Sequence, residues 1–103
     1  MEKIKAADMD MKINSSRWLI LDFSSPGCAP CKRISAVINE TLADVAAAGS
    51  AVAAYEVDIV TEPALAQRFM VLGVPTVIIF KQGREVARLN SIANKEKLKQ
   101  LLV

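Results

Sequence analysis

The apolar positions of this chain follow two kinds of spacing in turn. A near-continuous apolar run covers residues 18–23, as expected of a central strand that is buried on both faces. Over residues 28–47, apolar side chains instead recur every three or four positions, which is typical of a helix with one buried face. Pro30 would lie in the first turn of this helix, where its missing N–H costs little, and Gly49 would end it.

The same change of spacing continues to the C-terminus. Further strands are predicted at residues 51–58, 76–80 and 85–89, and further helices at 63–69 and after a capping Asn94. The turn 81–84 contains Gly83, whose permissive backbone suits a hairpin. The N-terminal pattern is weaker and predicts a short edge strand at 2–5 and a marginal helix at 7–15.

This order of elements predicts the α/β class with a mixed central β-sheet. A β-α-β unit supplies a parallel pair of strands, and the last two strands form an antiparallel hairpin. Helices would then cover both faces of the sheet. With 103 residues, the chain is expected to form a single domain over residues 1–103.

Composition narrows the class of protein further. Apolar residues make up 52% of the chain and charged residues 23%, as in ordinary globular domains. The net charge of +2 is too small to indicate nucleic acid or a membrane surface as a partner, and the apolar runs fall short of the roughly 20 residues that cross a bilayer. The charged start, Met1 to Lys5, has no apolar signal-peptide core. We therefore expect a cytoplasmic monomer.

The candidate chemistry lies in the two cysteines of the chain, Cys28 and Cys31. They stand between the strand at 18–23 and the helix that follows it. A C-x-x-C at such a junction indicates a dithiol/disulfide redox centre. The thiolate is the reactive form, and the start of a helix stabilises it. The spacing lets the second thiol attack a mixed disulfide formed by the first.

Other interpretations of the cysteine pair stay open at this point. The two residues can be small buried hydrophobes, or a structural disulfide, although so short a loop constrains the unfolded chain little. A structural zinc site needs four ligands, and the chain has no histidine and no third cysteine, so carboxylates or a second copy would have to complete it. We expect no metal and no organic cofactor, only a redox-active Cys28–Cys31 disulfide.

Trp18 and three methionines are better explained by packing than by chemistry. Trp18 precedes the first strong strand, ten residues before Cys28. The flexible side chains of Met9, Met11 and Met70 suit core positions or the filling of gaps.

Taken together, the motifs resemble those of the thioredoxin family. They occur in family order with near-family spacing and span most of the chain. The matching segments are Asp22-Phe23, Cys28-x-Pro30-Cys31, Asp58, Gly73-Val74-Pro75-Thr76, Phe80 and Gly83. Each motif is weak alone, but the joint set is specific.

The resemblance implies roles for three side chains. Cys28 would be the exposed attacking thiolate, and Cys31 would be the less exposed resolving thiol. Asp22 would be a buried carboxylate that carries a proton to or from Cys31. From the residues alone, Asp22 could equally be a strand-end carboxylate that accepts hydrogen bonds from turn N–H groups, although buried carboxylates are costly unless paired or functional.

The resemblance also implies a substrate-binding surface. Pro75 would follow a cis peptide bond and face the disulfide, with Val74 before it. The backbone of this loop would pair with an extended substrate segment. Gly27, Ala29 and Pro30 would complete the contact surface around the cysteines.

The activity implied is that of a protein disulfide reductase. It would take electrons from a thioredoxin-reductase-type donor and pass two of them to protein disulfides. Two alternatives remain: a thioredoxin-fold binding or adaptor module with a narrow partner set, and a glutaredoxin-like carrier. A dedicated oxidant is disfavoured because Ala29-Pro30 places no histidine between the cysteines.

Five positions depart from the usual family pattern. Gly27 and Ser24 stand where the family has tryptophan, and Ala29 and Ser91 where it has glycine. Ala54 replaces the lysine that commonly accompanies the buried aspartate. These changes bear on the substrate surface and on the surroundings of Asp22, and they leave the dithiol itself intact.

Overall fold

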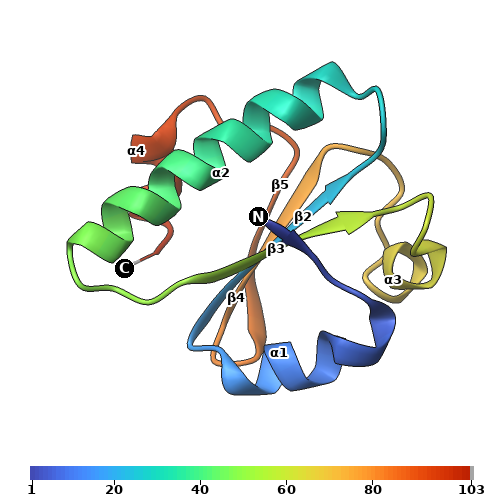
Figure 1. The fold of residues 1–103 in the computed structure, drawn as a ribbon, viewed down its shortest axis with the longest axis horizontal. Coiled ribbons are helices and arrows are strands. Elements are labelled where there is room, and N and C mark those ends of the chain that lie inside the picture. Colours follow the sequence, from blue (N-terminus) through green and yellow to red (C-terminus); the bar gives the residue numbers. More distant parts are fainter. Residues whose placement is uncertain (103) are drawn as a thin grey trace.

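The computed structural model describes residues 1–102 (Figure 1). The strands are β1 (Glu2–Lys3), β2 (Trp18–Ser24), β3 (Ala53–Asp58), β4 (Thr76–Lys81) and β5 (Arg84–Leu89). The helices are α1 (Met9–Ser15), preceded by a 3-10 turn (Ala6–Asp8), α2 (Ala29–Ala47), α3 (Pro63–Arg68) and α4 (Lys95–Gln100). Within residues 1–102, no helix is both long enough and apolar enough to cross a membrane.

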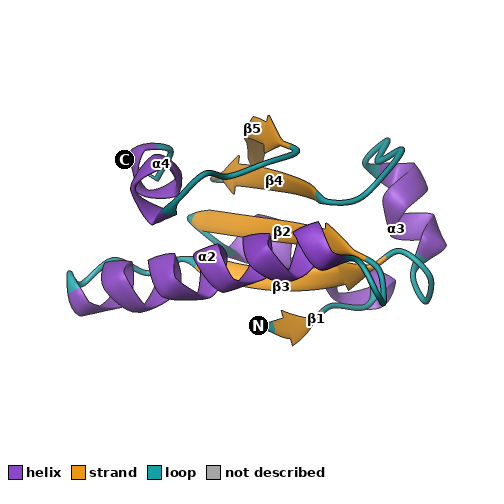
Figure 2. Ribbon diagram, turned by 90° about the horizontal axis from the view of Figure 1, so that it is seen from above, coloured by secondary structure: helices purple, strands orange, loops and turns teal. Residues whose placement is uncertain are grey.

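The strands form a mixed sheet in the order β1-β3-β2-β4-β5 (Figure 2). Both pairs made by β3 are parallel, and the pairs β2–β4 and β4–β5 are antiparallel. The helices α2 and α4 cover one face, and α1 and α3 cover the other. The predicted α/β class, with a parallel unit followed by a hairpin, is confirmed.

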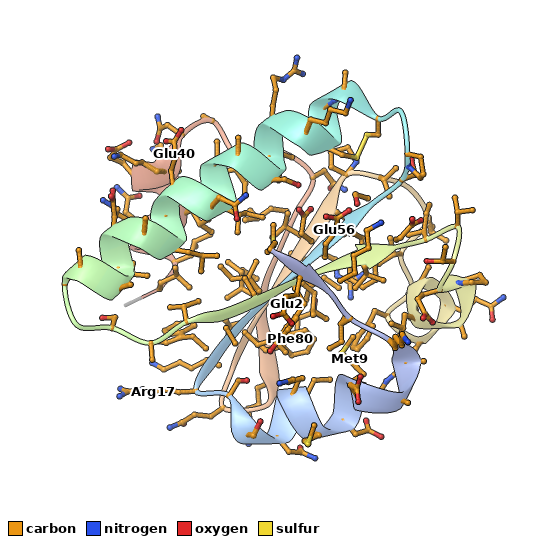
Figure 3. The ribbon with its side chains drawn as sticks, viewed as in Figure 1. Glu2, Met9, Arg17, Glu40, Glu56 and Phe80 are labelled. Carbon is orange, nitrogen blue, oxygen red and sulfur yellow. A yellow bond between two sulfur atoms is a disulfide. The ribbon has the colours of Figure 1, made fainter. Side chains whose placement is uncertain are left out.

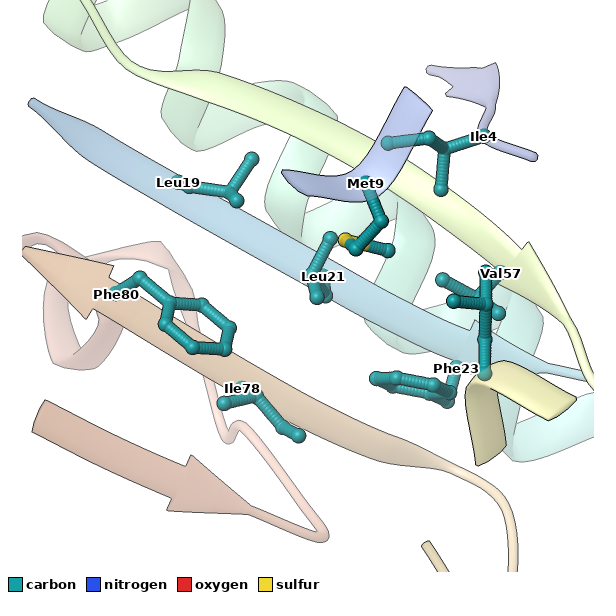
Figure 4. Packing of buried hydrophobic residues seen from close by; sticks show 9 residues of the cluster. Ile4, Met9, Leu19, Leu21, Phe23, Val57, Ile78 and Phe80 are labelled. Atoms are coloured by element: carbon teal, nitrogen blue, oxygen red, sulfur yellow. The ribbon is translucent and has the colours of Figure 1, made fainter. Parts of the chain in front are cut away.

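Strand β2 sends alternate side chains to the two faces of the sheet. Leu19, Leu21 and Phe23 enter the core beneath α1 and α3 (Figure 4). Ile20 joins the core beneath α2 and α4. All four side chains are fully buried, and each contributes about 1.5–3 kcal/mol from the removal of apolar surface from water. The same alternation turns Asp22 toward the α2 face.

The ends of some elements differ from the prediction by one or two residues. Strand β3 begins at Ala53, not at residue 51, and its first pair with the neighbouring strand β2 is Ala53 with Leu19. Helix α2 begins at Ala29, and Cys28 is its N-cap. The predicted turn at Gly83 is confirmed: Gln82 and Gly83 have φ of 50° and 82°, as in the two-residue turns that fit hairpins best.

The packing role predicted for Trp18 is confirmed, but that of the methionines is only partly right. Trp18 is 8% exposed and belongs to the α2-side core. Met9 is fully buried, whereas Met11 is 58% exposed and Met70 is 78% exposed. Met70 lies in the turn after α3 with a φ of 56°. The prediction for Met11 and Met70 is wrong because both side chains point to solvent.

Candidate active site

A tight turn carries the chain from the end of β2 to the start of α2. The N–H of Cys28 donates to the Ser25 carbonyl at 3.3 Å. Between them, Pro26 precedes Gly27, whose φ is +78°. Proline followed by a residue with positive φ is the signature of a type II turn, which favours glycine at the second position. The turn therefore favours glycine at position 27 and places Cys28 at the start of the helix.

The cysteine pair lies at the N-terminus of the longest helix in the described part of the chain (Figure 3). Cys28 and Cys31 are joined by a disulfide, with their Cα atoms 5.3 Å apart. Cys28 Sγ accepts a hydrogen bond from the Cys31 N–H at 3.2 Å, as an N-cap side chain does. Cys31 is only 2% exposed, whereas Cys28 is half-buried. The N-cap hydrogen bond and the helix dipole both favour negative charge on the Cys28 sulfur in the reduced protein.

Asp22 lies beneath the start of α2 and is fully buried. Its Oδ2 accepts a hydrogen bond from the Ser35 hydroxyl at 2.5 Å, and its Oδ1 has no hydrogen-bond partner among residues 1–102. Burial raises the pKa of Asp22 to about 6, the Ser35 hydrogen bond opposes the rise, and the negative charge of Glu56 adds to it. The strand-end alternative is wrong, since Asp22 lies two residues before the end of β2 and its partner is a helix side chain.

A second carboxylate, Glu56, lies beside Asp22 on the neighbouring strand. The parallel register of β2 and β3 pairs Asp22 with Glu56. Figure 3 labels Glu56 between α2 and the strands. Glu56 Oε1 accepts a hydrogen bond from the Ser24 hydroxyl at 2.9 Å. Ser24, at one of the missing tryptophan positions, thus holds a carboxylate next to the site.

Neither Ser35 nor Glu56 was predicted from the sequence. Ser35 follows Cys31 by four positions, and this spacing puts both side chains on one face of a helix; that signal was available. The position of Glu56 depends on the register between two strands, which has no local signature. Only the structure brings these two side chains to the buried carboxylate.

A polar groove of about 460 Å³ connects these groups to the cysteines. Both cysteines, Ser24, Ser35 and Glu56 line it, while Asp22 lies behind them. Its other lining residues are Lys3, Ser25, Pro26, Gly27, Lys32, Ala36, Asn39 and Asp58. Solvent that enters the groove reaches Ser35 and Glu56 before it reaches Asp22.

The loop that leads into β4 lies at the same end of the sheet as the cysteines. The register pairs Phe23 with Thr76, so the segment leaving β2 and the segment entering β4 emerge side by side. The Val74–Pro75 peptide bond is cis. This loop lines a second groove of about 370 Å³, flanked by Met70 and by the fully exposed Leu72. Contact between Pro75 and Cys28 stays a prediction.

Within residues 1–102, no group of three or more histidine, cysteine, aspartate or glutamate side chains is arranged to hold a metal ion. The redox-active disulfide is the reactive group of the site.

A disulfide of this spacing, capping a helix on a mixed sheet of this order, defines a thiol-disulfide exchange protein. The thioredoxin family model matches residues 1–103. A thioredoxin of Staphylococcus aureus is 33% identical over 100 residues, covering 97% of this chain and 92% of that protein. The chain belongs to the thioredoxin family.

Solved structures agree with this assignment. A mutant thioredoxin of Halobacterium salinarum superposes with a TM-score of 0.82 at 27% identity, covering 97% of this chain and 85% of that one. Plasmodium falciparum thioredoxin superposes with a TM-score of 0.81 at 26% identity, covering 99% of this chain and 96% of that one. The protein is a thiol-disulfide oxidoreductase that exchanges two electrons with protein disulfides through Cys28 and Cys31.

The turn before the cysteines gives a first testable prediction. Replacing Gly27 with tryptophan, the residue usual in the family, is expected to lower the free energy of unfolding by about 1–2 kcal/mol, because a side chain at positive φ is strained. No atom lies within 4 Å of a Cβ built at Gly27, so the Cβ itself would not clash, and the expected strain is that of the backbone at positive φ. Guanidinium unfolding measures the change.

Gly73→Ala is the matched control. A Cβ at Gly73 also meets nothing within 4 Å, and its φ lies outside the left-handed range. We expect this variant to unfold at nearly the denaturant midpoint of the parent. Equal losses in both variants would contradict the role given to the turn.

Proposed function

We propose that the chain reduces protein disulfides with Cys28 as the attacking thiolate and Cys31 as the resolving thiol. The observation that carries this assignment is the asymmetry of the pair. Cys28 Sγ is the half-buried cap of α2 and accepts the Cys31 N–H, whereas Cys31 is 2% exposed. Only Cys28 has both access to a protein substrate and a hydrogen bond that favours its thiolate.

The reaction then has two exchange steps. The Cys28 thiolate attacks one sulfur of the substrate disulfide, the substrate S–S bond breaks, and the released substrate thiolate takes up a proton. Cys31 then loses its proton and attacks Cys28 Sγ. The mixed disulfide breaks, the second substrate sulfur leaves as a thiolate that takes up a proton, and the Cys28–Cys31 disulfide forms. The substrate gains two electrons, and the protein dithiol loses them.

In this proposal Asp22 accepts the proton of Cys31 during the second step. The pKa of Asp22, raised by burial to about 6, suits a general base that works near neutral pH. Asp22 is held by Ser35, which lies one helical turn after Cys31. The same carboxyl would return the proton when the disulfide is reduced again.

The partners proposed are protein disulfides and a thioredoxin-reductase-type electron donor. The exposed side chains of Met70 and Leu72 beside Val74 and Pro75 suit an extended, partly apolar segment that pairs with the loop backbone. Gly27, Ala29 and Pro30 would form the rest of the contact surface. We propose that residues 1–103 act as one monomeric domain in the cytoplasm, where a reducing environment supplies the dithiol.

Reduction of insulin separates the proposed reductase from its alternatives. We expect catalytic reduction of the insulin disulfides, followed by turbidity, when NADPH and a thioredoxin reductase supply electrons. Reduction supported only by glutathione would indicate the glutaredoxin-like carrier. The chain could instead bind proteins but fail to catalyse insulin reduction with either donor or with dithiothreitol. That result would indicate the adaptor module and overturn the proposal.

A further inference from the structure

The surroundings of Asp22 lack the cation that commonly accompanies this aspartate in the family. Ala54 stands at the expected lysine position and packs in the α2-side core. The charged groups around the groove are Glu56 and Asp58 from β3, Lys3 from β1 and Lys32 from α2. The β4 residue in register with Asp22 is the apolar Val77. Lys3 forms its ion pair with Asp58 at 3.8 Å.

Ser35 supplies the hydrogen bond that the buried carboxylate has in the described structure. A serine in mid-helix often bonds back to the carbonyl four residues earlier. Thr41, six residues later on the same helix, does so, donating to the Val37 carbonyl at 2.8 Å. Ser35 instead donates across to Asp22 Oδ2 at 2.5 Å, and Asp22 Oδ1 has no partner within residues 1–102. The carboxylate therefore depends on this hydroxyl.

Ser35 also lines the groove that contains the cysteines. Ser35, Cys31 and Glu56 line the groove, and Asp22 is fully buried behind them. Cys31 and Ser35 are four residues apart on α2, so their side chains are neighbours on one helix face.

We propose that Ser35 is a positioning residue for Asp22. Its hydroxyl holds the carboxylate beside the groove that contains Cys31 and stabilises the ionised form of Asp22. Glu56 acts in the opposite sense, because its charge lies beside Asp22 and disfavours a second negative charge. Ser35 alone therefore acts in the sense of the missing cation, by favouring the ionised carboxylate. The expected effect of Ser35 on the reaction rests on the proton transfer proposed for Asp22. The expected effect of Ser35 on the pKa of Asp22 does not.

Titration of the Asp22 carboxyl carbon by NMR tests this link without any assay of activity. In Ser35→Ala the midpoint should rise by about one pH unit, the order expected when a carboxylate loses a charge-assisted hydrogen bond. In Glu56→Gln the midpoint should fall. Ser35→Thr keeps a hydroxyl and should restore a midpoint near that of the parent.

Two matched controls separate these shifts from general effects of substitution. Thr41→Val removes a buried hydroxyl from the same helix, and Glu40→Gln removes a carboxylate from its exposed side (Figure 3). Neither should move the Asp22 midpoint. An unchanged or lowered midpoint in Ser35→Ala, or shifts of the same sign in Ser35→Ala and Glu56→Gln, would overturn the proposal.

The pH dependence of the second exchange step tests the connection to the reaction. A preformed mixed disulfide at Cys28 is resolved in a stopped-flow instrument. If the Asp22 midpoint moves from about 6 to about 7, Ser35→Ala should be about fivefold slower at pH 6 and nearly unchanged at pH 8. A shifted carboxyl titration with an unshifted rate profile would retain the Ser35–Asp22 link but overturn the proton-transfer role proposed for Asp22.

Discussion

Replacement of Cys31 with serine is expected to convert the protein from a catalyst into a trap. Cys28 keeps its position as the N-cap of α2, but no thiol remains to attack the mixed disulfide. Turnover in the insulin assay should fall to the uncatalysed background, while substrate proteins stay attached through Cys28. Non-reducing electrophoresis should show the adducts, and dithiothreitol should release them.

The matched variant is Cys28→Ser, which retains only the buried Cys31. Because Cys31 is 2% exposed, this variant should also lose turnover but should trap little or no substrate. Alkylation of the reduced parent at neutral pH should label Cys28 first for the same reason. Adducts that form mainly in Cys28→Ser would mean that the two cysteines have the opposite roles.

Replacement of Asp22 with asparagine is expected to stabilise the fold and slow the reaction. The pKa of Asp22 rises from 3.8 in the unfolded reference to about 6 in the folded protein. The folded state therefore binds more protons between these values, and its stability decreases as the pH rises from about 4 to 6. The difference of about two between these pKa values corresponds to about 3 kcal/mol of folding free energy lost at neutral pH.

The amide in Asp22→Asn cannot ionise, so the gain in stability should be absent near pH 4, grow between pH 4 and pH 6, and be complete above pH 6. We expect about 2 kcal/mol at pH 7, because an unpaired buried amide offsets part of the gain. Urea unfolding at both pH values measures the difference. Asp44→Asn is the control of opposite sign. Hydrogen bonds from Lys99 and Lys95 lower the pKa of Asp44, so the ionised carboxylate stabilises the folded protein at neutral pH and this stabilisation is lost in acid.

The same Asp22→Asn variant should be about 10²-fold slower in resolving a mixed disulfide, the usual size of a general-base contribution. The attack of Cys28 on a substrate should change little, because that step does not require the Cys31 proton to leave. A variant that is less stable at pH 7 and fully active would mean that Asp22 has a structural role only.

Much of the architecture followed from local patterns in the chain. The apolar run at β2, the helical spacing of α2 and the turn at Gly83 each have a short-range cause: burial, periodicity and backbone freedom. The C-x-x-C likewise indicates its chemistry, because a thiol pair at the start of a helix has few other uses. For these reasons the class of fold and the reactive cysteines could be predicted from the residues alone.

The surroundings of the buried carboxylate were decided by tertiary structure. The register of β2 and β3 places Glu56 beside Asp22, and the packing of α2 across the sheet brings Ser35 to Asp22 Oδ2. The exposure of Met11 and Met70 had the same origin, since it depends on which side of a short element meets the core. Strand pairing and helix docking join residues that are far apart in sequence, so no local spacing contains this information.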